Sequence, residues 1–258
     1  MSEQNWFSIP VIHGRKNLKV SNDVKKWWGS FRDSNIYEPQ LIELFLNKLW
    51  EQGPDENGNY FFLDVGANTG SFCLMAAFFP QIKCLAYEPN KETYDVLEKN
   101  IFLNELQSQV SAYNIALWSE DTKKKLCVPQ DKTDSGLATL SKDPQRINTN
   151  EKNTGYNVIE TECRSLDSHL AEVTANQKVS ALKIDTEGAD LYVLKGAKEL
   201  ILRDKQLILT EFDNKNTTQF GYDRQEIIDF LASLGYRNFS KVGTNPDPNE
   251  WGDLIAEW

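Results

Sequence analysis

The sequence is short of positive charge. Its 258 residues include 28 lysines and arginines against 38 aspartates and glutamates, which gives a formal net charge of -10. No basic block interrupts this balance, so the sequence does not supply the long-range attraction with which proteins approach a phosphate backbone. We therefore expect no nucleic acid as a partner.

Long apolar runs and paired cysteines are lacking as well. No stretch approaches the ~20 apolar residues that span a bilayer, and the N-terminal segment contains no apolar run of signal-peptide length. We expect a soluble, cytoplasmic protein without a membrane partner. The cysteines form no C-x-x-C pair of the kind that binds zinc, so we expect buried, reduced thiols at Cys73, Cys84, Cys127 and Cys163.

The pattern that organises the chain is a strand, a turn and a helix. Residues 60–65 form an apolar run of strand length, and residues 71–79 suit a buried helix. The glycines of the intervening turn let the backbone approach a ligand closely, and the helix start presents free N–H groups. A dinucleotide fingerprint would require glycine at Asn68 and Ser71. The turn therefore predicts a nucleotide-type ligand but argues against a nicotinamide dinucleotide.

Polar residues near the ends of the next two strands extend this site. Glu88 follows the strand 82–87, about 20 positions beyond the turn, where a carboxylate can accept hydrogen bonds from both hydroxyls of a ribose. Residues 110–118 are expected to form the third strand. Asn114 and Ala116 would then lie near its carboxyl end, where an adenine ring would bind.

A second strand, loop and helix pattern carries carboxylates. Asp185 and Glu187 follow the apolar strand 181–184, and Glu211 follows the strand 206–210. Because ligands bind at the carboxyl ends of strands in an open parallel sheet, all three are candidates for the same site. Glu187 has a second interpretation, as an acidic residue that favours a helix start.

Together these patterns predict an α/β fold, with a doubly wound, mostly parallel, seven-stranded sheet. Residues 38–258 would form this domain, preceded by an aromatic-rich extension or lid at 1–37. A long polar insertion at about 119–157 would form a hairpin, a flap over the substrate or a solvated excursion without a role. Three further helices are expected to be opened by Glu38-Pro39, capped by Asn90 and ended by Gly235, and closing strands are expected at 236–242 and 253–258. A short helix from Ser165 would carry His169 as a packing or surface residue.

The ordered set of motifs resembles the FkbM-type methyltransferases, also called methyltransferase family 21. This resemblance implies the Rossmann-like class I methyltransferase fold, S-adenosylmethionine as the methyl donor, S-adenosylhomocysteine as the product, and a hydroxyl of a sugar, glycan or natural product as the acceptor. A protein acceptor and a non-catalytic nucleotide-binding module are the alternatives. The matching segments are Tyr37-Glu38-Pro39, Asp64 to Gly70, Tyr87-Glu88-Pro89, Asn114 to Leu117, Leu166-Asp167, Leu182 to Gly188 and Val193 to Ala197.

The resemblance also implies roles for single residues. A carboxylate can take the proton of the acceptor hydroxyl, and Asp185 is the first candidate, with Glu187 or Glu211 second. A divalent ion held by these carboxylates could instead activate the hydroxyl, although no ligand spacing requires a metal and no metal ligand is assigned. The residues expected to bind the cofactor are Glu38, Asp64, Gly66, Ala67, Asn68, Thr69, Gly70, Glu88, Pro89, Asn114, Ala116 and Asp185.

Overall fold

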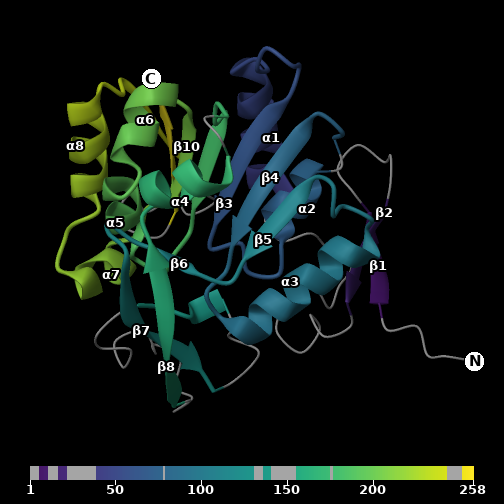
Figure 1. The fold of residues 1–258 in the computed structure, drawn as a ribbon. Helices are drawn as coiled ribbons and strands as arrows, with labels where there is room; N and C mark the ends of the chain where they lie inside the picture. Colours follow the sequence, from purple (N-terminus) through teal and green to yellow (C-terminus); the bar gives the residue numbers. More distant parts are fainter. Residues whose placement is uncertain are drawn as a thin grey trace, which may run out of the picture.

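A single large sheet forms the centre of the computed structural model, which describes residues 6–10, 17–21, 39–77, 79–130, 136–140, 155–174, 177–242 and 252–258. Five neighbouring strands, which carry the motifs, pair in parallel. The two C-terminal strands extend the sheet at one edge through antiparallel pairing. The expected doubly wound, mostly parallel α/β fold is confirmed. In spatial order the strands are β11 (Asn238–Val242), β12 (Asp253–Glu257), β10 (Leu207–Glu211), β9 (Ala181–Ile184), β3 (Tyr60–Val65), β4 (Ile82–Tyr87) and β5 (Val110–Tyr113) (Figure 1).

Helices cover both faces of the sheet (Figure 1). Successive residues of β3 point to opposite faces, so Phe62 packs among the helices of one layer while Phe61 and Leu63 pack among those of the other. This alternation explains why the central strands are apolar throughout. One layer contains α1 (Pro39–Glu51), α2 (Ser71–Ala77) and α3 (Lys91–Leu103), and the other contains α4 (Leu166–Val173), α5 (Asp190–Lys195), α6 (Lys198–Asp204) and α8 (Gln225–Leu234).

Local capping fixes several helix ends where the sequence predicts them. Asn90 accepts a hydrogen bond from the N–H of Glu92 at the start of α3, and Ser165 accepts one from the N–H of Ser168 at the start of α4. Gly235 ends α8 in the left-handed conformation with a φ of 114°.

Buried side chains in this part of the fold match their expected roles. His169 is 5% exposed and packs edge-on against the rings of Tyr87 and Tyr113, as a packing residue. All four cysteines are buried free thiols, as expected. Within the described ranges, no helix has the length and apolarity needed to cross a membrane.

The expected third strand is wrong in its extent. The large sheet uses only residues as far as Tyr113, and the chain then turns away to form β6 (Ala116–Leu117) in a separate three-stranded sheet. Asn114 explains the break, because its side-chain amide donates to the carbonyl oxygens of Glu88 and Pro89 at 2.9 and 3.0 Å. These bonds fix Asn114 against the end of β4, at the point where the chain leaves the ladder.

The second sheet forms an arm beside the large one (Figure 1). β7 (Thr122–Pro129) pairs antiparallel with β8 (Tyr156–Arg164), and β8 pairs parallel with β6. We call β7, β8 and the described residues 136–140 the arm. Part of the predicted insertion therefore folds as a strand pair, and its second strand continues beyond residue 157 to Arg164.

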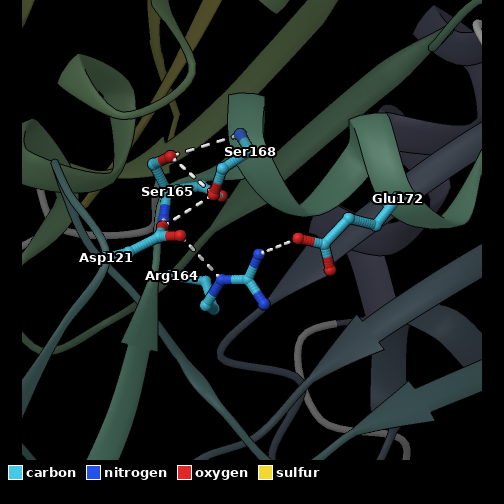
Figure 2. Close-up of polar contacts among 5 residues, drawn as sticks. All are labelled: Asp121, Arg164, Ser165, Ser168 and Glu172. Carbon is cyan, nitrogen blue, oxygen red and sulfur yellow. Dashed lines mark hydrogen bonds and ion pairs between the residues drawn. The ribbon is translucent and has the colours of Figure 1, made fainter.

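A polar network ties the base of the arm to α4 (Figure 2). Asp121 accepts hydrogen bonds from the N–H of Ser165 at 2.8 Å and from the hydroxyl of Ser168 at 2.6 Å. Its other oxygen pairs with Arg164, which also binds Glu172. The hydroxyl of Ser168, the N–H of Ser165 and the charge of Arg164 together hold the pKa of Asp121 below its ordinary value.

We expect Asp121→Ala to loosen the arm by about 1 kcal/mol, since it removes two hydrogen bonds and an ion pair that is half exposed. Hydrogen exchange of the β7 and β8 amides measures this change, with the neighbouring exposed Glu120→Ala as the control. Because the folded pKa of Asp121 is depressed, its contribution is present above the ordinary value of about 4 and is lost as the pH falls through the folded pKa. Equal exchange in the two variants would contradict this role.

The N-terminal extension is described only in part. β1 (Trp6–Pro10) and β2 (Asn17–Ser21) form an antiparallel pair that the sequence does not predict, and β2 lies against α3. The rest of the expected extension lies outside the described residues, and so does Glu38 at the expected start of the domain. The extension and the lid therefore both stay predictions. Between β10 and α8 the chain forms α7 (Asn214–Thr217) and the 3₁₀ helix Thr218–Phe220.

Candidate active site

A cleft opens at the carboxyl ends of β3, β4 and β9. The cleft lies where the chain crosses from one side of β3 to the other, which is the position of ligands in open α/β sheets. Its walls are Val65, Gly66, Asn68, Tyr87, Glu88, Pro89, Ile115, Ala116, Leu117, Leu126, Gly136, Ala138, Leu140, Asp185, Thr186, Glu187 and Ala189.

The turn after β3 and the loop after β9 touch through their backbones. Gly66 has a φ of 74°, and a Cβ at this position would lie 1.8 Å from the carbonyl oxygen of Asp185. The site therefore requires glycine for two reasons, the left-handed backbone and the close approach of the neighbouring loop.

We expect Gly66→Ala to lower the free energy of unfolding by about 2–3 kcal/mol more than Gly58→Ala does. Gly58 is a matched control, because it has a similar φ of 79° but its Cβ would meet nothing within 4 Å. Both variants incur the left-handed backbone strain, and only the first forces two loops apart. Urea unfolding measures the difference, and equal losses would show that the loops can separate without cost.

Glu88 and Asn68 form the polar end of the cleft beside the turn. Glu88 is 7% exposed, and its two carboxylate oxygens accept from the N–H of Asn68 at 3.1 Å and of Asn90 at 2.8 Å. Burial outweighs these bonds and raises the pKa of Glu88 to about 7. The side-chain oxygen of Asn68 is buried without a hydrogen-bond partner among the described residues. This oxygen is placed to accept a hydrogen bond from a ligand.

Lys183 links the two loops beneath the cleft. Its ammonium group donates to the carbonyl oxygen of Gly66 at 3.0 Å and lies 3.3 Å from Asp64 Oδ1 and 3.4 Å from Asp185 Oδ2. Burial alone would lower the pKa of Lys183, but the charges of Asp64 and Asp185 more than offset it, and the net shift is upward. Sequence reasoning assigned this residue no role, although a lysine inside the buried strand β9 was a usable signal.

Two glutamate carboxyls, from the loop after β9 and from the end of β10, are bridged by one asparagine. The side-chain nitrogen of Asn216 donates at 3.0 Å both to Glu187 Oε2 and to Glu211 Oε1. Burial is the largest cause that raises the pKa of both glutamates well above the ordinary value, and neighbouring carboxylates add to it. Glu187 lines the cleft, whereas Glu211 is not among its wall residues. We call Glu187, Glu211 and the bridging Asn216 the carboxyl pair.

The segment that carries these features matches a known family. A family model described as the methyltransferase FkbM domain covers residues 64–238, which contain every described wall residue of the cleft. The chain belongs to the FkbM methyltransferase family.

Two curated proteins and one solved structure are similar to this chain. Methyltransferase 1 of Beauveria bassiana (strain ARSEF 2860) is 30% identical over 162 residues, which cover 60% of this chain and 64% of that protein. Methyltransferase sdnD of Sordaria araneosa is 32% identical over 160 residues, covering 55% and 61%. This chain thus spans a little over 60% of each relative. The methyltransferase FkbM of Methylobacillus flagellatus KT shares the fold, with a TM-score of 0.51 and 14% identity over 76% of this chain and 43% of that one.

The FkbM motif residues divide into wall and support. The described structure places seven of the predicted site residues on the cleft wall, namely Gly66, Asn68, Glu88, Pro89, Ala116, Asp185 and Glu187. Glu38 lies outside the described residues, and the other predicted residues do not line the cleft. Asp64 is buried beneath the turn against Lys183, Ala67 donates to the carbonyl of Tyr87, the carbonyl of Thr69 accepts from Asn100, Gly70 packs against Leu74 and Leu97, and Asn114 fixes the end of β4.

The arm supplies wall residues that sequence reasoning missed. Leu126 of β7 and Gly136, Ala138 and Leu140 close the cleft opposite the FkbM motifs. The hydroxyl of Thr139 also donates to the carbonyl of Glu187 at 3.1 Å, so the arm contacts the acidic loop directly. The only signal in the sequence was the pair of short apolar islands in an otherwise polar segment, at 126–128 and 137–140.

Proposed function

We propose that the cleft binds S-adenosylmethionine and that the protein transfers its methyl group to a hydroxyl of a small-molecule, sugar or glycan acceptor in the cytoplasm. One observation carries the proposal. In a chain of the FkbM family, the glycine turn, the buried Glu88 and the acidic loop after β9 surround one cleft. The mostly acidic balance of the chain supports an acceptor other than nucleic acid.

The residues on the wall fit the chemical parts of this donor. The unpartnered oxygen of Asn68 suits the ammonium group of a methionine end, and the buried carboxylate of Glu88 suits a pair of ribose hydroxyls. Pro89 and Ala116 offer apolar surface for an adenine ring. Asp185 also lines the cleft, and its negative charge would complement a positively charged sulfur.

The chain's own residues then have three tasks. S-adenosylmethionine, when bound, supplies a methyl group on a positively charged sulfur that leaves as a neutral thioether. The arm and the motif loops exclude water and align the acceptor with that methyl group, which accounts for much of the rate in such transfers. A carboxylate takes the hydroxyl proton, and we place Asp185 or Glu187 in this role because both line the cleft. Burial raises the pKa of Glu187 well above its ordinary value, and the charges of Asp185 and Asp190 add to this shift.

Titration calorimetry with S-adenosylhomocysteine tests the proposal. We expect binding in roughly the micromolar range that is common for enzyme ligands. NADPH serves as the control ligand and should not bind, because the glycine pattern argues against a dinucleotide. Binding of NADPH without binding of the thioether would overturn the proposal. Incubation with labelled S-adenosylmethionine and a panel of sugars, lysates and peptides then identifies the acceptor class.

A further inference from the structure

We propose that the carboxyl pair reads the charge of the ligand in the cleft: it releases a proton when the sulfonium of S-adenosylmethionine enters and retains that proton when neutral S-adenosylhomocysteine is bound. This inference rests on the proposed function and extends it to the regulation of the base. Its consequence is that Glu187 is ionised when a methyl group is available for transfer.

The geometry of the pair couples its two carboxyls through one amide. Each hydrogen of the Asn216 amide is directed to a different carboxyl, so one amide orients both glutamates. Glu211 is 8% exposed, and its second oxygen is buried without a hydrogen-bond partner in the described part of the chain. Two ionised carboxylates in such a site would repel each other at close range, and a proton on one of them removes that repulsion.

Groups from each neighbouring element increase this preference. Asp185 on the β9 loop, Asp190 at the start of α5 and Asp213 before α7 all act on the pair, and all are acidic. The hydroxyls of Thr186 and Thr210 bind Asp190 at 3.1 Å, while Lys183 pairs with Asp64 and Asp185. The tyrosine hydroxyl of Tyr222 donates to the carbonyl of Gly188 and adds no charge. These acidic neighbours therefore disfavour two ionised carboxylates in the carboxyl pair.

Only one member of the pair can sense the ligand directly. Glu187 lines the cleft, so a cation bound there faces its carboxyl, and Glu211 responds through Asn216. An opposite charge within about 4–6 Å lowers the pKa of a carboxyl by about 1 to 3, whereas a neutral thioether exerts no such attraction. Donor and product differ in this charge and share their ribose and amino-acid groups.

The transfer closes the proton balance. As the acceptor oxygen forms its bond to the methyl carbon, the carbon–sulfur electron pair stays on sulfur and the hydroxyl proton passes to Glu187. The pair thereby regains the proton that it released when the donor bound. Release of the neutral product leaves the pair in its starting state, ready for the next cationic donor.

Calorimetry in two buffers tests the inference on the unmodified protein. Titrations at about pH 7 in phosphate and in Tris, which differ in ionisation enthalpy, give the number of protons exchanged on binding. We expect S-adenosylmethionine to release about 0.5 to 1 proton more than S-adenosylhomocysteine. Glu88, whose pKa is also about 7, meets the same ribose in both ligands, so its contribution cancels in the difference.

Two variants assign the proton to the pair. Glu187→Gln should reduce the difference to near zero, because it removes the carboxyl on the cleft wall. Glu211→Gln, which lies off the cleft wall, should reduce it only in part, because burial, Asp185 and Asp190 still raise the pKa of Glu187. The exposed Asp229→Asn on α8 is the matched control and should keep the full difference. Equal proton release by the two ligands overturns the inference and leaves the proposed function intact. A difference that survives both glutamine variants also overturns it, and failure of both ligands to bind overturns the proposed function with it.

Discussion

Replacing Lys183 with methionine is expected to lower the free energy of unfolding by about 3–5 kcal/mol. The side chain of Lys183 is 6% exposed and that of its partner Asp64 is fully buried, so the substitution leaves a carboxylate in the core without its counter-charge. Burial already raises the pKa of Asp64, and loss of the ammonium raises it further. The hydrogen bond to the carbonyl of Gly66 is lost as well. Urea unfolding followed by tryptophan fluorescence measures the loss.

Two controls separate the buried charge from the lost packing. Asp64→Asn in the Lys183→Met background should recover part of the stability, because the stranded charge is removed. Lys198→Met, at an exposed position on α6, should change stability by about 0.5 kcal/mol or less. A loss for Lys183→Met as small as that of the surface control would show that the ion pair does not hold the two loops together.

Glu88→Ala should weaken the binding of S-adenosylhomocysteine by at least about 100-fold. In the proposed complex the carboxylate accepts hydrogen bonds from two ribose hydroxyls, and bonds to a charged group contribute about 1.5–3 kcal/mol each. The substitution also leaves the N–H groups of Asn68 and Asn90 without their acceptor, so the turn beside the ligand loosens. Titration calorimetry, with a thermal melt of each variant, measures both effects.

Glu88→Gln is the matched variant for this prediction. Its side-chain oxygen can still accept one hydrogen bond, so we expect an affinity between those of the wild type and the alanine variant. If the alanine variant binds as tightly as the parent protein while remaining folded, the ribose assignment of Glu88 is wrong.

Much of the fold was predictable because local chemistry and tertiary packing agree. Asn90 and Gly235 occupy positions where only a few residue types satisfy a helix end, and they end their helices as expected. The apolar run of β3 could form only a strand covered on both faces, and it lies in the middle of the sheet. The glycine turn predicted a ligand site because Gly66 has no substitute at its backbone angle and distance.

The parts that escaped prediction depend on contacts distant in sequence. The strand pattern of residues 110–118 is continuous, and only the bonds from Asn114 to the end of β4 show where the sheet is left. Lys183 is an ordinary charged residue until the fold places Asp64 and Asp185 on either side of it. The short apolar segments of the arm do not indicate which part of the fold they pack against, so nothing local showed that Leu126 and Leu140 line the cleft.

The pairing of β3 with β9 has a consequence for the synthesis of the protein. Val65 is the partner of Ile184, so β3 leaves the ribosome well before the strand that covers its second edge. Until then, the backbone of one edge of β3 has no partner strand and can pair with other chains, and Phe62 and Leu63, buried in the folded protein, belong to this strand. Such delayed, non-local closure slows folding and exposes nascent chains to aggregation. Co-translational chaperones should therefore matter more for the yield of this protein than its stability once β9 is in place.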